Sequence, residues 1–172
     1  MIHKAHHQAN RSSALHGHVA MQSILDFKVL RASPLFAHVE EKMLLSIVSS
    51  MQHERWSRGY SLDSPGRFGS QFFLLLQGRV KVGRHHLNNG RELTLFLLGP
   101  GDGFNVLGLI DGDSHDLHVH ALDPVDVLYA PLDHWYAWLD QYPALRTSVA
   151  RVAASQIEHL TSLASELALD DT

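Results

Sequence analysis

The sequence predicts an α+β, mainly β domain. We expect an antiparallel double-stranded β-roll of the jelly-roll type, with N-terminal helices and a long C-terminal dimerisation helix. Apolar residues recur at helical intervals over residues 21–51, and again from Pro143 to the end of the chain. Between residues 53 and 131, short apolar runs alternate with Gly, Pro and Asn turn signals, which is typical of antiparallel rolls and sandwiches.

The composition is that of one folded domain of 172 residues, with 45% hydrophobic and 19% charged residues. The formal net charge of −4 argues against direct nucleic-acid binding by this segment, since phosphate contacts need a basic face. The absence of cysteine excludes disulfides and thiolate-bound iron–sulfur clusters. No apolar run approaches the roughly 20 residues that span a bilayer, so we expect a cytoplasmic protein with no membrane partner.

Residues 1–20 are expected to form a flexible tail, because they are polar and hold five histidines at irregular spacing. The helical pattern then begins at Met21 and is interrupted at Ser33-Pro34. A second helix is predicted from Val39 to Met51. Its apolar face consists of Leu44, Ile47, Val48 and Met51.

Four apolar runs are the clearest strands: Phe72–Leu76, Val80–Val82, Leu93–Leu97 and Val125–Tyr129. The first of them is continuous, which predicts a strand buried on both faces. Asn88-Asn89-Gly90 favours a tight hairpin, because Asn and Gly tolerate positive φ. The strands on either side of this turn should therefore pair.

The C-terminal part is predicted to be helical. Asp133 is expected to cap a short helix that carries Trp135 and Trp138, and Pro143 to open the last helix. In that helix a 4-3-4-3-4 spacing defines a heptad seam, formed by Val149, Ala153, Gln156, Leu160, Leu163 and Leu167. The seam predicts a parallel coiled coil with a second copy of the chain, with Gln156 helping to fix the register. The alternative is a helix packed on its own domain.

Residues 58–129 resemble the cyclic nucleotide-binding fold of the CRP/FNR family of transcription regulators. The matching segments are Arg58–Leu62, Phe72–Val82, Gly90–Leu95, Leu98–Phe104 and, upstream, Pro34–Phe36. The resemblance implies a sensor domain over residues 21–142, and a dimerisation helix with the start of a hinge over residues 143–172. The family's helix-turn-helix should begin after Thr172, so we expect a homodimer that binds DNA only through a domain absent from this chain.

The resemblance also places an effector pocket in the roll. In relatives that bind cyclic nucleotides, a Glu holds the ribose and an Arg pairs with the phosphate. Val106 stands at the Glu position here, His115 stands at the Arg position, and Asp116 would repel a phosphate. We therefore expect weak or absent binding of cyclic AMP, and either another small-molecule effector or none. The expected pocket residues are Phe104, Asn105, Val106, Leu107, Gly108, His115, Asp116, Leu117 and His159.

Four alternatives remain open. In the carbon-monoxide-sensing relatives the haem ligands come from the start of this segment; the resemblance places Asn105 and Leu107 there, and neither ligates iron well. His118 and His120 share a strand face and could hold a metal, but their alternation with apolar residues favours an exposed polar face. A cupin-like metalloenzyme on this roll would need further ligands that the spacing does not offer, and no catalytic motif is apparent, so we expect no enzyme. A ligand-free dimerisation module would also explain Val106 and His115.

Overall fold

The computed structural model describes residues 25–63, 66–85, 90–112 and 116–170. The predicted tail over residues 1–20, the Asn88-Asn89 part of the hairpin turn, His115 and the last two residues of the predicted hinge lie outside the described residues.

Two four-stranded antiparallel sheets form the roll. One has the order β1 (Gln52–Trp56), β8 (Val125–Pro131), β3 (Gln71–Gln77), β6 (Gly103–Phe104). The other has the order β2 (Ser61–Asp63), β7 (His118–Ala121), β4 (Val80–His85), β5 (Glu92–Leu98). The predicted fold class is confirmed, and β4 pairs with β5 as the hairpin signal indicated. Of the segment Arg58–Leu62, which matches the family, only Ser61 and Leu62 lie in a strand, because Gly59, at φ 86°, lies in a turn.

Strand β3 is buried on both faces, as its continuous apolar run predicted. Phe73 and Leu75 point into the roll, where they pack with Val80 and Val119 of the other sheet. The alternate residues, Phe72, Leu74 and Leu76, pack against the helices. Both faces are apolar because the first sheet separates two cores, one inside the roll and one under the helical layer.

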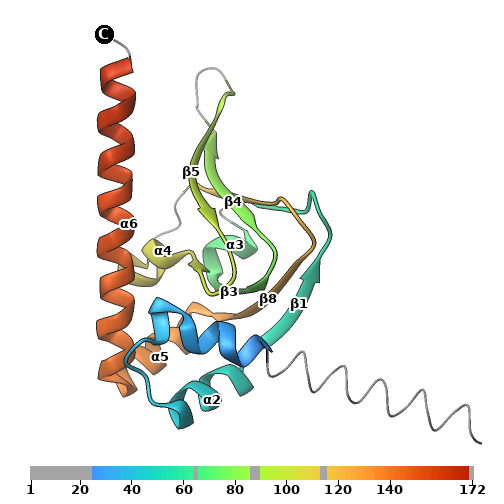
Figure 1. Cartoon of the computed structure of the whole chain (residues 1–172), viewed down its shortest axis with the longest axis vertical. Helices are drawn as coiled ribbons and strands as arrows, with labels where there is room; N and C mark the ends of the chain where they lie inside the picture. The colour runs from blue at the N-terminus through green and yellow to red at the C-terminus, as the bar shows by residue number, and fades with distance from the viewer. Residues whose placement is uncertain (1–24, 64–65, 86–89, 113–115, 171–172) are drawn as a thin grey trace, which may run out of the picture.

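The helical layer lies on the outer face of the first sheet (Figure 1). It comprises a helix over residues 25–32, η1 (Pro34–Phe36), α2 (Glu41–Ser49) and α5 (Leu132–Gln141). Ser33 ends the first helix as predicted, and its Oγ donates to the carbonyl of Gly101 at 2.6 Å. The expected cap at Asp133 is wrong: α5 already begins at Leu132 after Pro131, so Asp133 lies in the first turn. Two short helices, α3 (Arg67–Ser70) and α4 (Val106–Asp111), interrupt the roll.

The last helix, α6 (Pro143–Asp170), begins at the predicted proline and runs along the whole molecule (Figure 1). Val149 and Ala153 are each 3% exposed and belong to the core of their own domain. Intramolecular packing therefore already accounts for the first two positions of the predicted seam. Further along, Leu167 is 45% exposed. No helix in the described part of the chain is long and apolar enough to cross a bilayer.

Candidate ligand-binding site

The expected effector pocket is built around a strained turn between β6 and α4. Asn105 adopts φ 74°, and it is the one non-glycine residue with positive φ among those described. Its side-chain Nδ2 donates to the carbonyls of Phe68 and Gln71, both at 2.9 Å. Gly108 is required beside it, because a Cβ there would lie 2.4 Å from Asn105 Oδ1. The side-chain NH2 group of Asn105 therefore anchors this segment to α3 and β3, and both of its hydrogens are used.

The space at this position is small. A cavity of about 20 Å³ lies between the roll, α4 and α6. It is lined by Val82, Phe96, Leu98, Phe104, Asn105, Val106, Leu107, Leu117 and Gln156. A volume of this size holds about one water molecule, whereas small-molecule sites usually occupy about 300–1,000 Å³. As bounded by the described residues, which leave out 113–115, this cavity is too small for a nucleotide.

The structure brings five of the expected pocket residues to this cavity: Phe104, Asn105, Val106, Leu107 and Leu117. Gly108 packs under Asn105, and Asp116 is exposed. His159 is used elsewhere, since its Nε2 lies 2.9 Å from the carbonyl oxygen of Leu95 on β5. Sequence reasoning missed Gln156 as a cavity residue, because a polar residue in an apolar heptad pattern was explained as a register device.

His118 lies on the outer face of the second sheet, and it is buried, not exposed as predicted (7% exposed). Its Nε2 lies 3.0 Å from Glu92 Oε1, although not in hydrogen-bond alignment, and the His85 ring stacks on it at 4.1 Å between centroids. The ring fits because Gly83, beneath it, has no side chain: a Cβ there would lie 3.0 Å from His118 Nε2.

A network of polar contacts occupies the two histidines that were considered as metal ligands. Lys81 Nζ lies 2.7 Å from the same Glu92 oxygen. Contact with Lys81, and then with His118, lowers the pKa of Glu92 to about 2. His120 Nδ1 lies 2.9 Å from Ser61 Oγ on the neighbouring strand. Within the described ranges, no group of three or more His, Asp or Glu residues is arranged to hold a metal ion.

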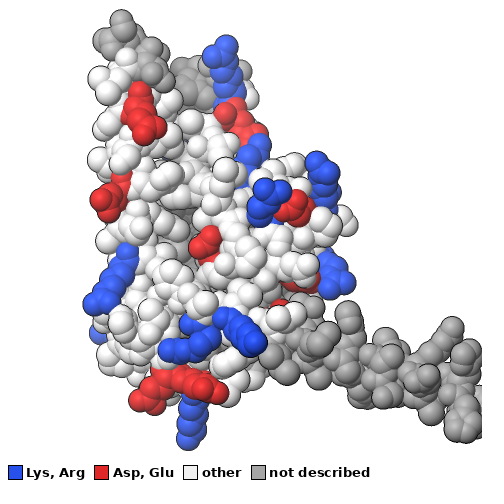
Figure 2. Space-filling view, viewed as in Figure 1, with Lys and Arg blue, Asp and Glu red and all other residues white. Residues whose placement is uncertain are grey.

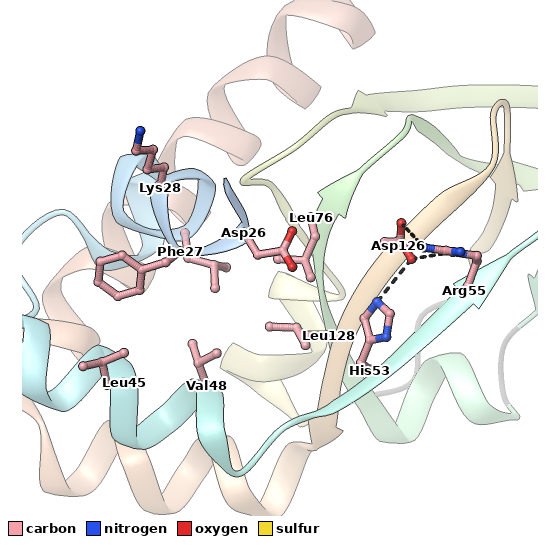
Figure 3. A pocket seen from close by; sticks show the side chains of 11 residues that line it. Asp26, Phe27, Lys28, Leu45, Val48, His53, Arg55, Leu76, Asp126 and Leu128 are labelled. Carbon is pink, nitrogen blue, oxygen red and sulfur yellow. Dashed lines mark hydrogen bonds and ion pairs between the residues drawn. The ribbon is translucent and has the colours of Figure 1, made fainter. Parts of the chain in front are cut away.

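A larger hollow of about 700 Å³ lies outside the roll, between the first sheet, α2 and the helix over residues 25–32 (Figure 3). Phe27, Leu45, Val48 and Leu128 supply much of its apolar wall. At one end of the hollow, Asp126 accepts two hydrogen bonds from Arg55: Nε donates to Oδ1 at 2.9 Å, and Nη2 donates to Oδ2 at 3.3 Å. His53 Nε2 lies 3.2 Å from the same Oδ1. The buried carboxylate of Asp126 is therefore paired with two side chains of the neighbouring strand β1, Arg55 and His53.

Residues 54–142, just over half of the chain, match the family model of the cyclic nucleotide-binding domain. The chain belongs to this family. Within the cyclic nucleotide-binding domain family, its relatives include a CRP-like cAMP-activated global transcriptional regulator from Mycobacterium tuberculosis. That regulator is 23% identical over 144 residues, and the match covers 84% of this chain and 64% of the relative.

Two further comparisons agree. A global nitrogen regulator from a Nostoc species is 31% identical over 69% of this chain and 53% of its own length. The crystal structure of the Thermus thermophilus catabolite activator protein superposes with a TM-score of 0.69 at 25% identity, covering 79% of this chain and 63% of that one. The predicted resemblance to CRP-type regulators is thus confirmed. The chain spans less than two thirds of the length of these relatives.

Proposed function

We propose that this chain is the effector-sensing and dimerisation domain of a CRP-like transcription regulator, and that its roll does not bind cyclic AMP. The observation that carries the proposal is the contrast between an intact fold and a cavity that is small among the described residues. The β6–α4 segment forms the turn at Asn105, with its positive φ, whereas the cavity measures about 20 Å³ and Val106 is only 1% exposed. An apolar side chain at that position offers no acceptor for a ribose hydroxyl.

The test is calorimetric titration of the purified chain with cyclic AMP and with cyclic GMP. We expect no saturable heat at micromolar concentrations. The cyclic AMP receptor protein of Thermus thermophilus, which is 26% identical over 74% of this chain, is the positive control. Micromolar affinity for either nucleotide would contradict the proposal.

We also propose that the C-terminal half of α6 joins two copies in a parallel pair through Leu160, Leu163 and Leu167. Support comes from the apolar surface of this helix: Ile157 is 55% exposed and Leu167 is 45% exposed. Leu163→Arg should convert a dimer to a monomer in sedimentation equilibrium. Ser162→Arg, an exposed neighbour outside the seam, is the matched control and should leave the mass unchanged. A wild-type chain that sediments as a monomer would contradict the dimer.

Contact with DNA would then depend on a separate module of the regulator. On the face shown in Figure 2, cationic and anionic side chains are interspersed and no continuous basic patch forms. Without such a patch, this face has little to offer a phosphate backbone.

A ligand-free dimerisation module is the second candidate, and the same small cavity favours it. An effector screen by thermal shift separates the two candidates. A compound that stabilises the chain and also changes its dimerisation constant supports the sensor, whereas a chain that responds to no compound supports the ligand-free module.

A further inference from the structure

A second cleft, of about 340 Å³, lies between η1 and α6, outside the roll. Figure 1 shows the chain around η1 passing close to the lower half of α6. The cleft has walls of opposite charge: Arg151 comes from α6, and Asp102 comes from the turn after β5. Pro34, Leu98 and Val152 add apolar surface between them. Its volume is at the lower end of the range of about 300–1,000 Å³ for small-molecule sites.

Arg151 carries a positive charge that the described part of the chain does not neutralise. Its Nη1 lies 2.6 Å from His38 Nε2. A guanidinium can only donate, so His38 accepts with its Nε2 lone pair and is neutral in this contact. No described carboxylate lies within ion-pair distance of Arg151, unlike Arg55, Arg67 and Arg79. The guanidinium therefore has donors left for an anionic group.

Ser148, one turn before Arg151, is a buried hydroxyl without a partner. It lines the cleft, it is 1% exposed, and its Oγ makes no hydrogen bond. Other hydroxyls of the same helix bond back to the carbonyl four residues earlier: Thr147, Thr161 and Ser165 do so at 3.1, 2.9 and 3.0 Å. A buried hydroxyl that makes no bond carries a desolvation cost, which a polar ligand atom in the cleft would remove.

Asp102 limits the chemistry of the ligand. One of its oxygens, Oδ2, accepts from the backbone N–H of Gly99 at 2.9 Å, and Oδ1 has no partner among the described residues. A simple carboxylic acid would meet repulsion from this side. A zwitterion instead satisfies both walls, with its carboxylate on Arg151 and Ser148 and its ammonium on Asp102.

We propose that the cleft between η1 and α6 binds a small zwitterion of the amino-acid type, whose hydrocarbon part contacts Pro34, Leu98 and Val152. Gln156 lines both this cleft and the small cavity beside the roll. An occupant would therefore contact the side chain that connects the roll to α6. This link to signalling rests on the proposed sensor function, whereas the binding itself does not.

The test uses the purified chain and the standard L-amino acids, each titrated by calorimetry at millimolar concentrations. Propionate and n-propylamine, which carry one charge each, are titrated in parallel. At least one amino acid should bind, and neither single-charge probe should match it. Arg151→Gln should weaken that amino acid at least tenfold, about 1.4 kcal/mol, and Ser148→Ala should weaken it less. Arg146→Gln is the matched control, because Arg146 lies on the same helix and donates to the carbonyl of Leu139, outside the cleft lining.

Three results would overturn the proposal: no binding of any amino acid, binding that Arg151→Gln leaves unchanged, or propionate binding as tightly as the best amino acid. Thermal melting of each variant establishes that it is folded before it is titrated. Failure of the dimer or cyclic-nucleotide experiments leaves this proposal standing, because those experiments do not involve the cleft. Conversely, amino-acid binding that leaves the dimerisation constant unchanged removes the link to signalling and retains the site.

Discussion

The imidazole of His159 on α6 donates from Nε2 to the backbone carbonyl of Leu95 on β5, across 2.9 Å. The acceptor is a carbonyl, so Nε2 must carry a hydrogen, and it does so in the protonated ring and in one neutral tautomer. The ring also packs on Phe96, with 5.4 Å between centroids. This pair of contacts connects the β4–β5 hairpin to the helix that we propose as the dimer seam.

Replacing His159 should loosen that connection. His159→Phe keeps an aromatic ring but removes the donor, and the loss of one exposed hydrogen bond is worth about 1 kcal/mol or less. We expect faster hydrogen exchange of the amides in β5 and unchanged exchange in β3. His134→Phe, an exposed histidine on α5, is the control. Unchanged exchange in β5 would show that the contact does not restrain the hairpin.

Gly83 should tolerate no side chain. In Gly83→Ala the new Cβ would lie 2.8 Å from the backbone oxygen of Leu93 and 3.0 Å from His118 Nε2. The backbone oxygen cannot move without disturbing the β4–β5 pairing, so we expect a loss of about 1–3 kcal/mol in the free energy of unfolding. Urea denaturation measures it. Gly99→Ala is the matched control, because nothing lies within 4 Å of the position that its new Cβ would take and the residue does not have positive φ.

Glu92 should make stability depend on pH in the acid range. Its folded-state pKa is lowered from 4.5 to about 2 by Lys81 and His118. A carboxyl whose pKa is lowered by folding stabilises the protein above pH 4.5, and this contribution is lost as the pH falls towards 2. The melting temperature of Glu92→Gln should therefore fall less than that of the wild type over this interval. Glu158→Gln, an exposed carboxylate on α6 without a described ion pair, should follow the wild type; a parallel fall for Glu92→Gln would contradict the assignment.

Asn105 should stabilise the fold in two ways, by tolerating a positive φ and by donating hydrogen bonds from its side-chain amide. Asn105→Ala places an ordinary residue at φ 74° and leaves the carbonyls of Phe68 and Gln71 without their donor. Together these effects should cost about 3 kcal/mol of unfolding free energy. Asn105→Gly keeps the backbone freedom and loses only the amide, so it should be less destabilised than Asn105→Ala. Equal stability of the two variants would show that the positive φ carries no strain.

Much of the fold could be predicted because its signals are local. The run Phe72–Leu76 predicted a doubly buried strand, Pro143 predicted the start of α6, and the turn signal after His85 predicted the β4–β5 pair. The cap predicted at Asp133 was wrong, because Pro131 ends β8 and lets α5 begin at the next residue. The helix predicted from Val39 to Met51 was too long at both ends, since α2 spans Glu41–Ser49. The apolar periodicity continues beyond the residues that form the helix.

The site was harder to predict. Phe104, Val106 and Leu107 line one cavity because the β6–α4 segment keeps them close along the chain. Whether this cavity is an effector site stays a prediction. The size of that cavity and the presence of Gln156 in it depend on where α6 lies against the roll. The burial of His118 likewise depends on Glu92 and His85, which belong to other strands.

Residue identity and short-range spacing predicted the fold class and several of its strands and helices. The resemblance of short segments predicted the family. Three other features became known only from the folded chain: the described cavity beside α4 is small, Val149 and Ala153 belong to the core of their own domain, and Arg151, Ser148 and Asp102 share a cleft. These features join residues distant in sequence, and packing between such segments sets which side chains meet and how much space is left between them.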